Sequence, residues 1–215
     1  MSRPSKYEYV VIEGNIGSGK TTLSKLLAER WGSRLMLEEF KDNPFLPKFY
    51  SNPEQHGFAL ELSFLAERYH QKRDELNRTD LFKPGIVCDY SFAKSLVFAR
   101  INLDKDEFDL YQNLFHIIHG RLPKPDLLLF LYCSPEKSLR QIKSRGREYE
   151  QDIRLDYLEQ INNGYMEFFK QQTEMKIVIL NTDDLDFVKS TNDLDKIFRI
   201  IEGEYAIGIQ IIEKI

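Results

Sequence analysis

One octet decides the fold of this chain: Gly14-Asn15-Ile16-Gly17-Ser18-Gly19-Lys20-Thr21. It fits the pattern G-x-x-x-x-G-K-[ST], follows an apolar run that ends at Ile12, and opens a helical pattern from Leu23 to Trp31. A strand, a glycine-rich loop and a helix in this order form a phosphate-binding loop, because backbone N–H groups and the helix dipole attract phosphate oxygens. The sequence therefore predicts a site for a nucleoside triphosphate, in preference to a chance match in an ordinary glycine turn.

The phosphate-binding loop also predicts contacts for single residues. Lys20 can reach the β- and γ-phosphates, and the Thr21 hydroxyl can hold Mg²⁺. The residues predicted to bind the nucleotide are Gly14, Asn15, Ile16, Gly17, Ser18, Gly19, Lys20, Thr21 and Thr22.

Composition limits the class of protein and its partners. A length of 215 residues suits one α/β domain that spans residues 1–215. The net charge of −4 at pH 7 does not indicate the basic surface that polymeric nucleic acid needs. The start of the chain is polar and no apolar run approaches a membrane span, so neither a signal segment nor a membrane protein is indicated. The two cysteines, Cys88 and Cys133, are expected to be buried free thiols in a reducing cytoplasm.

Short β-rich runs alternate with longer amphipathic stretches along the chain. This alternation predicts the α/β class, with a parallel sheet of five strands flanked by helices. The predicted strands are Tyr7–Ile12, Arg34–Leu37, Ile86–Cys88, Leu127–Tyr132 and Lys176–Leu180. The predicted helices are Lys20–Trp31, Glu54–Thr79, Asp106–Arg121, Pro135–Ser144, Ile153–Gln171 and Asn192–Glu202. The apolar tail from Tyr205 to Ile212 receives no assignment.

Acidic residues follow two of the predicted strands. Glu38 and Glu39 come after the second strand, and Asp89 comes after the third. Ligands of parallel sheets bind outside the carboxyl ends of the strands, so these carboxylates should lie near the phosphate-binding loop. A glutamate there can accept the proton of an attacking hydroxyl, and Asp89 can hold Mg²⁺ through water. The alternatives are a charged loop for the glutamates and a helix N-cap for Asp89.

A basic segment precedes the predicted helix Ile153–Gln171. Arg145 and Arg147 flank Gly146, and such a pair could fold over a triphosphate and stabilise its developing charge. The alternative is a charged turn exposed to solvent, because most runs of charged residues lie on the protein surface.

Four motifs in this order resemble the deoxynucleoside kinase family, in particular its bacterial deoxyguanosine and deoxyadenosine kinase type. The family motifs read N-P-F-L followed by a tyrosine, D-Y-x-x-x-K, P-K-P-D and R-G-R-E-[FY]-E. They stand here as Asn43-Pro44-Phe45-Leu46 with Tyr50, Asp89-Tyr90 with Lys94, Pro123-Lys124-Pro125-Asp126, and Arg145-Gly146-Arg147-Glu148-Tyr149-Glu150. The resemblance covers nearly the whole chain. It implies a three-layer P-loop kinase fold with an arginine-bearing lid, and a homodimer formed by helix packing.

The resemblance also implies an activity and residue roles. A kinase of this family transfers the γ-phosphoryl group of ATP to the 5′-hydroxyl of a deoxynucleoside in nucleotide salvage, with Mg²⁺ positioning the donor. Glu38 matches the general base of the family. Tyr50 and Glu150 match the pair that holds the sugar 3′-hydroxyl, and Arg145 and Arg147 match the lid arginines.

The base is expected to be read by the long helix Glu54–Thr79. Glu61 and Arg68 are seven residues apart and so share one face of that helix. Arg68 matches a family arginine near the base and the sugar, and Glu61 stands where many relatives carry glutamine. A carboxylate accepts only, which suits the N1–H and N2–H₂ donors of guanine. We therefore expect a purine, with deoxyguanosine favoured over deoxyadenosine. The alternative is that Glu61 is a solvated helix residue.

Other functions share the phosphate-binding loop. A switch GTPase is disfavoured because the N-K-x-D motif is missing, since Asn181-Thr182-Asp183-Asp184 lacks the lysine. A thymidylate-type nucleoside monophosphate kinase would need further basic residues for the acceptor phosphate. A catalytically weak nucleotide-binding subunit also stays open, because Tyr90 and Gln141 stand where many relatives carry arginine.

Overall fold

The computed structural model describes residues 6–39, 43–76 and 85–215. Its strands are β1 (Tyr9–Gly14), β2 (Arg34–Met36), β3 (Ile86–Cys88), β4 (Leu127–Tyr132), β5 (Lys176–Asn181) and β6 (Gly208–Ile212). Its helices are α1 (Lys20–Trp31), α2 (Leu46–Ser51), α3 (Pro53–Leu76), α4 (Lys94–Asn102), α5 (Lys105–His119), α6 (Pro135–Arg145), the 3₁₀ helix η1 (Glu148–Glu150), α7 (Leu155–Lys170) and α8 (Thr191–Ile201).

The strands form one parallel sheet in the order β2-β3-β1-β4-β5-β6. This confirms the predicted α/β class with a parallel sheet. The predicted number of five strands is wrong, because the tail forms a sixth strand beside β5, with Ile177 opposite Ile209. The apolar tail has no strand pattern of its own that separates it from a helix, so its conformation depends on the hydrogen bonds that the edge of β5 offers.

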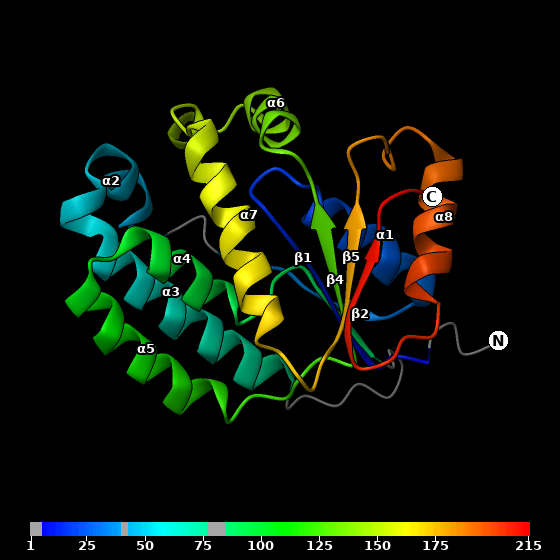
Figure 1. The fold of residues 1–215 in the computed structure, drawn as a ribbon, viewed down its shortest axis with the longest axis horizontal. Coiled ribbons are helices and arrows are strands. Elements are labelled where there is room, and N and C mark those ends of the chain that lie inside the picture. The colour runs from blue at the N-terminus through cyan, green and yellow to red at the C-terminus, as the bar shows by residue number, and fades with distance from the viewer. Residues whose placement is uncertain (1–5, 40–42, 77–84) are drawn as a thin grey trace.

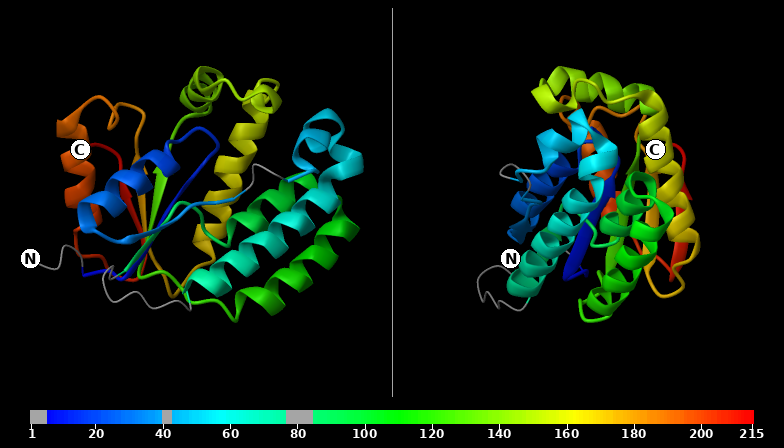
Figure 2. Two further views of the ribbon diagram at one scale, coloured as in Figure 1. Left: turned by 180° about the vertical axis from the view of Figure 1, so that it is seen from behind. Right: turned by 90° about the vertical axis from the view of Figure 1, so that its left-hand side faces the viewer.

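Both faces of the sheet are covered, which makes three layers. Alternate residues of a strand point to opposite faces, so Val10 and Ile12 pack with α1 and α8, while Val11 packs with α4 and α7. In Figure 1, α7 lies in front of the sheet, and α1 lies in front when the molecule is seen from behind in Figure 2. Burial on both faces explains why the sequence of β4, Leu127–Tyr132, is an unbroken apolar run.

The predicted helices are present within one or two residues of their expected ends. The end of the predicted helix Glu54–Thr79 lies outside the described residues, since α3 is described to Leu76. Two further helices, α2 and α4, were not predicted from the sequence. They have 6 and 9 residues, too few for a recognisable helical period, and they begin after Phe45 and Ala93 without a side-chain cap.

Two of the sequence motifs have structural roles away from the pocket. Asp126 of the P-K-P-D motif accepts hydrogen bonds from the backbone N–H groups of Glu8 and Tyr9, each at 2.8 Å, and so holds the start of β1. Asn43 donates from its amide to Ser63 Oγ at 2.9 Å, which fixes the segment before α2 against α3.

Other expectations concern the chain as a whole. Cys88 and Cys133 are free and buried, as predicted. Within the described ranges, no helix has both the length and the apolar composition that crossing a membrane requires.

The strands bring three functional segments to the same end of the sheet. The phosphate-binding loop follows β1, Glu38 follows β2, and Asp89 follows β3. Figure 1 shows α2 and α6 at the end toward which the strand arrows point. The site described below lies at this end, as expected for a parallel sheet with helices on both faces.

Candidate active site

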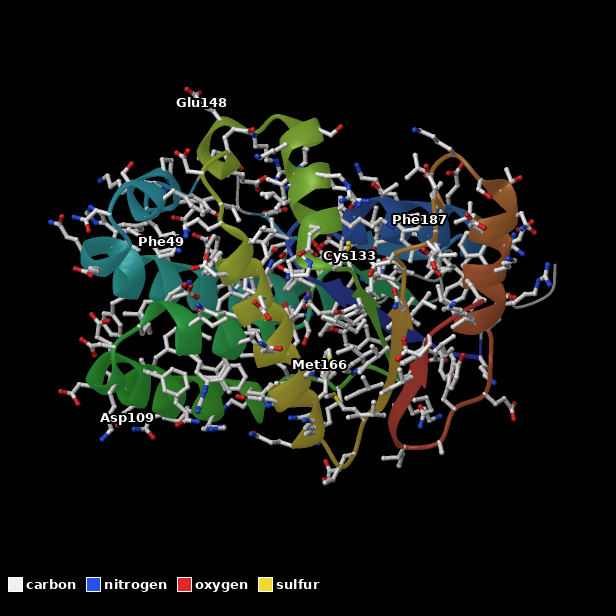
Figure 3. The ribbon with its side chains drawn as sticks, turned by 45° about the horizontal axis from the view of Figure 1, so that its top comes forward. Phe49, Asp109, Cys133, Glu148, Met166 and Phe187 are labelled. Carbon is white, nitrogen blue, oxygen red and sulfur yellow. The ribbon has the colours of Figure 1, made fainter. Side chains whose placement is uncertain are left out.

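The phosphate-binding loop requires its glycines. Gly17 and Gly19 have φ values of 82° and 89°, in the left-handed region that side chains disfavour. A Cβ at Gly19 would lie 2.6 Å from Cζ of Phe187, which precedes α8 (Figure 3), and a Cβ at Gly17 would lie 2.7 Å from the carbonyl oxygen of Ser138. Neighbouring elements therefore press closely on the loop, and only glycine lets its backbone take this path.

Asn15 fixes the loop against α7. Its amide nitrogen donates to the carbonyl oxygen of Leu158 at 2.7 Å and to Oδ1 of Asn162 at 2.8 Å, while its own Oδ1 accepts from the backbone N–H of Ile16 at 2.7 Å. These hydrogen bonds use both the amide nitrogen and the amide oxygen of the Asn15 side chain. Of the residues predicted to bind the nucleotide, Asn15 therefore has only its backbone to offer a phosphate.

Lys20 is folded back over the loop. Its Nζ donates to the carbonyl oxygens of Gly14 at 2.9 Å and Asn15 at 2.8 Å. Burial lowers the pKa of Lys20 to about 8, and repulsion from Lys94 acts in the same direction. A phosphate entering the loop would stabilise the ammonium form and compete with these two carbonyls for it.

Thr21 and Asp89 meet at the mouth of the loop. Thr21 Oγ1 donates to Asp89 Oδ2 at 2.6 Å, and Asp89 Oδ1 accepts from the backbone N–H of Glu38 at 2.7 Å. Hydroxyl and carboxylate oxygens are the hard ligands that Mg²⁺ prefers, together with phosphates and waters. Among the described residues, no group of three or more His, Cys, Asp or Glu side chains forms a metal cluster. The donor set thus fits an ion held by one or two protein oxygens.

Glu38 is largely enclosed, with 9% of its side chain exposed, and is paired with two cations. Its Oε1 accepts from Arg68 Nε at 2.8 Å, and its Oε2 accepts from Lys94 Nζ at 2.6 Å. Burial alone would raise the pKa of Glu38, but Lys94 and then Arg68 outweigh it and hold the pKa at about 2. The neighbouring Glu39 is exposed. Of the two glutamates, the one that matches the family's general base is therefore the one that lines the pocket.

Lys94 provides a cation that Tyr90 does not. Tyr90 is fully buried, and its hydroxyl donates to Gln71 Oε1 at 2.6 Å. Lys94, in the first turn of α4, reaches Glu38 instead. Lys94 thus brings a positive charge to Glu38 from four residues after Tyr90.

The predicted lid forms between α6 and α7. Arg145 pairs with Glu150 Oε2, and Arg147 donates to Glu150 Oε1 at 3.1 Å. Tyr149 stacks on Tyr50 with ring centroids 6.0 Å apart. Glu148 of the same segment points away from the protein in Figure 3. Both lid arginines are therefore paired with the glutamate that was expected to hold the sugar.

Glu61 lies at the other end of the site and is 1% exposed. The alternative of a solvated helix residue is therefore wrong. Its Oε1 accepts from Asn102 Nδ2 at 2.7 Å, and Tyr157 Oη donates to Asn102 Oδ1 at 3.1 Å. Its Oε2 is buried and has no hydrogen-bond partner among the described residues. Burial raises the pKa of Glu61 to about 7.

Asn102 and Tyr157 were not predicted as site residues. They come from α4 and α7, far from Glu61 in the sequence, and neither belongs to a motif. No sequence signal connects them, because only the packing of three helices brings them together.

A single pocket gathers most of the predicted residues. Gly14, Asn15, Ser18, Gly19 and Thr22 are the predicted ones that do not line it. The lining residues are Ile16, Gly17, Lys20, Thr21, Glu38, Leu46, Phe49, Tyr50, Leu60, Glu61, Phe64, Arg68, Asp89, Lys94, Phe98, Asn102, Arg145, Arg147, Tyr149, Glu150 and Tyr157. The pocket has phosphate-binding residues at one end and Glu61, among aromatic rings, at the other.

Comparisons with known proteins identify the family. A family model described as deoxynucleoside kinase matches residues 10–204. A deoxyguanosine kinase of Bacillus subtilis is 34% identical over 195 residues, covering 88% of this chain and 93% of that protein. A deoxyadenosine kinase of Dictyostelium discoideum is 33% identical, covering 92% of this chain and 79% of its own. A solved structure of deoxyadenosine kinase from M. mycoides with bound dATP shares the fold, with a TM-score of 0.78 and 23% identity over 91% of this chain and 100% of the other.

Proposed function

The chain belongs to the deoxynucleoside kinase family, and from that premise we propose that it transfers the γ-phosphoryl group of ATP to the 5′-hydroxyl of a purine deoxynucleoside. The names of its relatives, deoxyguanosine kinase and deoxyadenosine kinase, support a purine. The observation that carries the proposal is one pocket that joins the phosphate-binding loop to the buried carboxylates of Glu38 and Glu61.

Glu38 is proposed to receive the 5′-hydroxyl. The 5′-oxygen attacks the γ-phosphorus, the bond from that phosphorus to the β–γ bridging oxygen breaks, and ADP leaves. The hydroxyl proton passes to a Glu38 oxygen. With its pKa held near 2, Glu38 is a weak base, so its contribution is chiefly to orient the hydroxyl and to take the proton late in the transfer. Arg68 and Lys94 keep it ionised and in place.

The donor end is proposed to work by positioning charge. The loop backbone and Lys20 hold the phosphates, and Arg145 and Arg147 turn from Glu150 to the transferring group. Thr21 and Asp89 would hold Mg²⁺, which neutralises charge on the donor phosphates when bound. These roles account for the oxygen ligands at the loop and for the cations of the lid segment.

The acceptor end is proposed to hold sugar and base. Tyr50 and Glu150 lie together at the lid, where the 3′-hydroxyl of the sugar would be bound. Glu61 would accept from the N1–H and N2–H₂ groups of guanine, for which its unpartnered Oε2 is suited. The guanidinium of Arg68 lies 4.7 Å from the ring centre of Phe64. It pairs with Glu38 and acts through its charge on Glu61.

The remaining predictions concern the whole protein. We propose one kinase domain over residues 1–215, a cytoplasmic location and a homodimer. Three exposed apolar residues on one face of α5, Leu110, Leu114 and Ile117, offer a surface for helix packing between two copies. Light scattering would measure the mass in solution, and a monomer at micromolar concentration would contradict the dimer.

The activity is tested by ATP-dependent phosphorylation of the four natural deoxynucleosides and of dTMP, with and without Mg²⁺. We expect magnesium-dependent turnover that is fastest with a purine deoxynucleoside. Turnover of dTMP alone would identify a monophosphate kinase instead, and ATP binding without transfer to any acceptor would identify a nucleotide-binding subunit.

A further inference from the structure

Glu61 is a buried carboxyl group whose two oxygens differ in their surroundings. Oε1 accepts a hydrogen bond from Asn102, whereas Oε2 has no partner within the described part of the chain, although the residue is 1% exposed. A buried polar atom without a partner is costly unless something else satisfies it. Because Glu61 lines the substrate pocket, a bound base is the group that can do so.

Asn102 fixes which oxygen is left for the base. Its amide oxygen accepts from the Tyr157 hydroxyl at 3.1 Å, and its NH₂ group donates to Glu61 Oε1 at 2.7 Å. An amide that donates to Oε1 disfavours a proton on that oxygen. When Glu61 is protonated, the proton therefore belongs on Oε2, where it faces the pocket. Asn102 and Tyr157 thus act as positioning residues for Glu61.

The charged and titratable groups around Glu61 come from every element packed on it. Arg68 of α3, Lys94 of α4 and Glu38 after β2 act on it through their charges, and Tyr111 of α5 donates to its backbone oxygen at 3.4 Å. Tyr50 of α2 and Tyr157 of α7 complete the set.

Among these neighbours, Glu61 is the group that titrates near neutrality. Burial raises its pKa, and Arg68, the Asn102 hydrogen bond and Lys94 offset part of that rise, which leaves the pKa at about 7. The pKa of Glu38 is held at about 2, that of Arg68 is raised, and burial raises the pKa of all three tyrosines. None of these five groups changes charge between about pH 6 and pH 8.

Resting on the proposed function, we propose that Glu61 reads purines in two protonation states, accepting from guanine as a carboxylate and pairing with adenine as a carboxylic acid. Asn102 sets the oxygen that makes the distinction. One residue would then give the enzyme two purine substrates, with the proton deciding between them.

The donor and acceptor patterns of the bases explain this choice. Guanine presents two adjacent donors, N1–H and N2–H₂, and both match an ionised carboxylate that only accepts. Adenine presents an acceptor, N1, beside a donor, N6–H₂. The protonated Oε2 donates to N1, and Oε1, which keeps a lone pair after bonding Asn102, accepts from N6–H₂. If adenine meets the carboxylate, its N1 acceptor faces an oxygen that can only accept. If guanine meets the carboxylic acid, its N1–H donor faces the O–H donor of Oε2.

The test is the ratio of kcat/KM for deoxyguanosine to kcat/KM for deoxyadenosine, measured with the whole protein across about pH 6 to pH 8. Titration of Glu38, Lys20 or ATP affects both substrates alike and cancels in the ratio. We expect the ratio to rise by up to about tenfold for each pH unit, as for a single proton that separates the two substrates.

Two glutamine variants on the same helix provide the matched comparison. Glu61→Gln has the donor–acceptor pair of the protonated acid at every pH, so its ratio should favour deoxyadenosine and be independent of pH. Glu54→Gln, an exposed position in the first turn of α3, should keep the slope of the parent protein. A pH-dependent ratio in Glu61→Gln would overturn the proposal.

Asn102→Leu tests the positioning role. Its loss removes a hydrogen bond that lowers the pKa of Glu61, so at each pH the ratio should be lower than in the parent protein. An unchanged ratio would remove Asn102 from the proposal.

Calorimetry gives a readout without turnover. In buffers of different ionisation enthalpy near pH 7, deoxyguanosine binding should release protons and deoxyadenosine binding should take them up. Equal proton linkage for both purines would overturn the proposal. Phosphorylation of both purines at a constant ratio would overturn this inference alone, whereas no phosphorylation of any deoxynucleoside would overturn the proposed function and this inference with it.

Discussion

Glu38 and Glu61 are buried carboxyl groups at two ends of one pocket, yet their acidities differ greatly. The pKa of Glu38 is about 2, and that of Glu61 is about 7. Burial raises the pKa of both. Glu38 makes direct ion pairs with Lys94 and Arg68, whereas Glu61 receives one hydrogen bond from a neutral amide. The number of cations in direct contact, and not the depth of burial, decides the charge of each carboxyl group.

This difference separates two tasks within the pocket. At the phosphate end, a carboxylate that is always ionised can hold a hydroxyl for attack at any physiological pH. At the base end, a carboxyl group that titrates near neutrality can change the pattern that it offers to a base. Environments that push two carboxyl groups apart in pKa commonly mark such a division of roles.

The largest expected effect is the loss of Glu38. In Glu38→Ala, turnover should fall by about 10² to 10⁴, as is typical when a group that accepts a proton in the transition state is removed. ATP affinity should change little, because the phosphate-binding loop is intact. Steady-state kinetics and ATP titration measure the two quantities. Glu39→Ala is the matched control, since Glu39 is an exposed neighbour, and it should behave like the parent protein. Full activity in Glu38→Ala would assign no catalytic part to Glu38.

A second effect concerns stability at the base end. A carboxyl group whose pKa is raised from about 4.5 to about 7 by folding contributes a stability that is present at low pH and is lost as pH rises through about 7. The loss for Glu61 is about 3 kcal/mol. Glu61→Gln removes this loss, so its free energy of unfolding relative to the parent should increase by that amount between about pH 4 and pH 8.

Urea unfolding at the two pH values measures this difference. The exposed Glu54→Gln serves as control, and its difference from the parent should stay nearly constant. A pH-independent difference for Glu61→Gln would show that Glu61 titrates normally in the folded protein.

The smallest expected effect comes from a substitution that raises the pKa of Glu38 toward that of Glu61. Lys94 is the strongest of the cations that lower the pKa of Glu38, so Lys94→Met should raise that pKa. The pH profile of variant turnover divided by parent turnover, with one substrate, should then fall by about tenfold for each pH unit below the new pKa of Glu38. Lys105→Met, at an exposed lysine of α5, is the control. A flat profile for Lys94→Met would mean that Arg68 alone holds Glu38 ionised.

Most of the fold could be predicted from the sequence, because apolar runs with glycine and charged boundaries are local signals. All five predicted strands ended within about two residues of their predicted ends, and Ile86–Cys88, Leu127–Tyr132 and α1 were predicted without error. The short helices α2 and α4 and the strand β6 were missed. A helix of 6 residues and an edge strand are stabilised by their neighbours rather than by their own sequence.

The sequence by itself determined the phosphate-binding loop, the residues that follow each strand and the order of the family motifs, since these depend on spacing along the chain. Only the tertiary structure decided which cations surround Glu38, that Glu150 pairs with both lid arginines, and that Asn102 holds Glu61. Burial and charge pairing arise from residues distant in sequence, and these two quantities set the pKa of a side chain. The chemistry of each carboxylate could therefore not be read from its position in the chain.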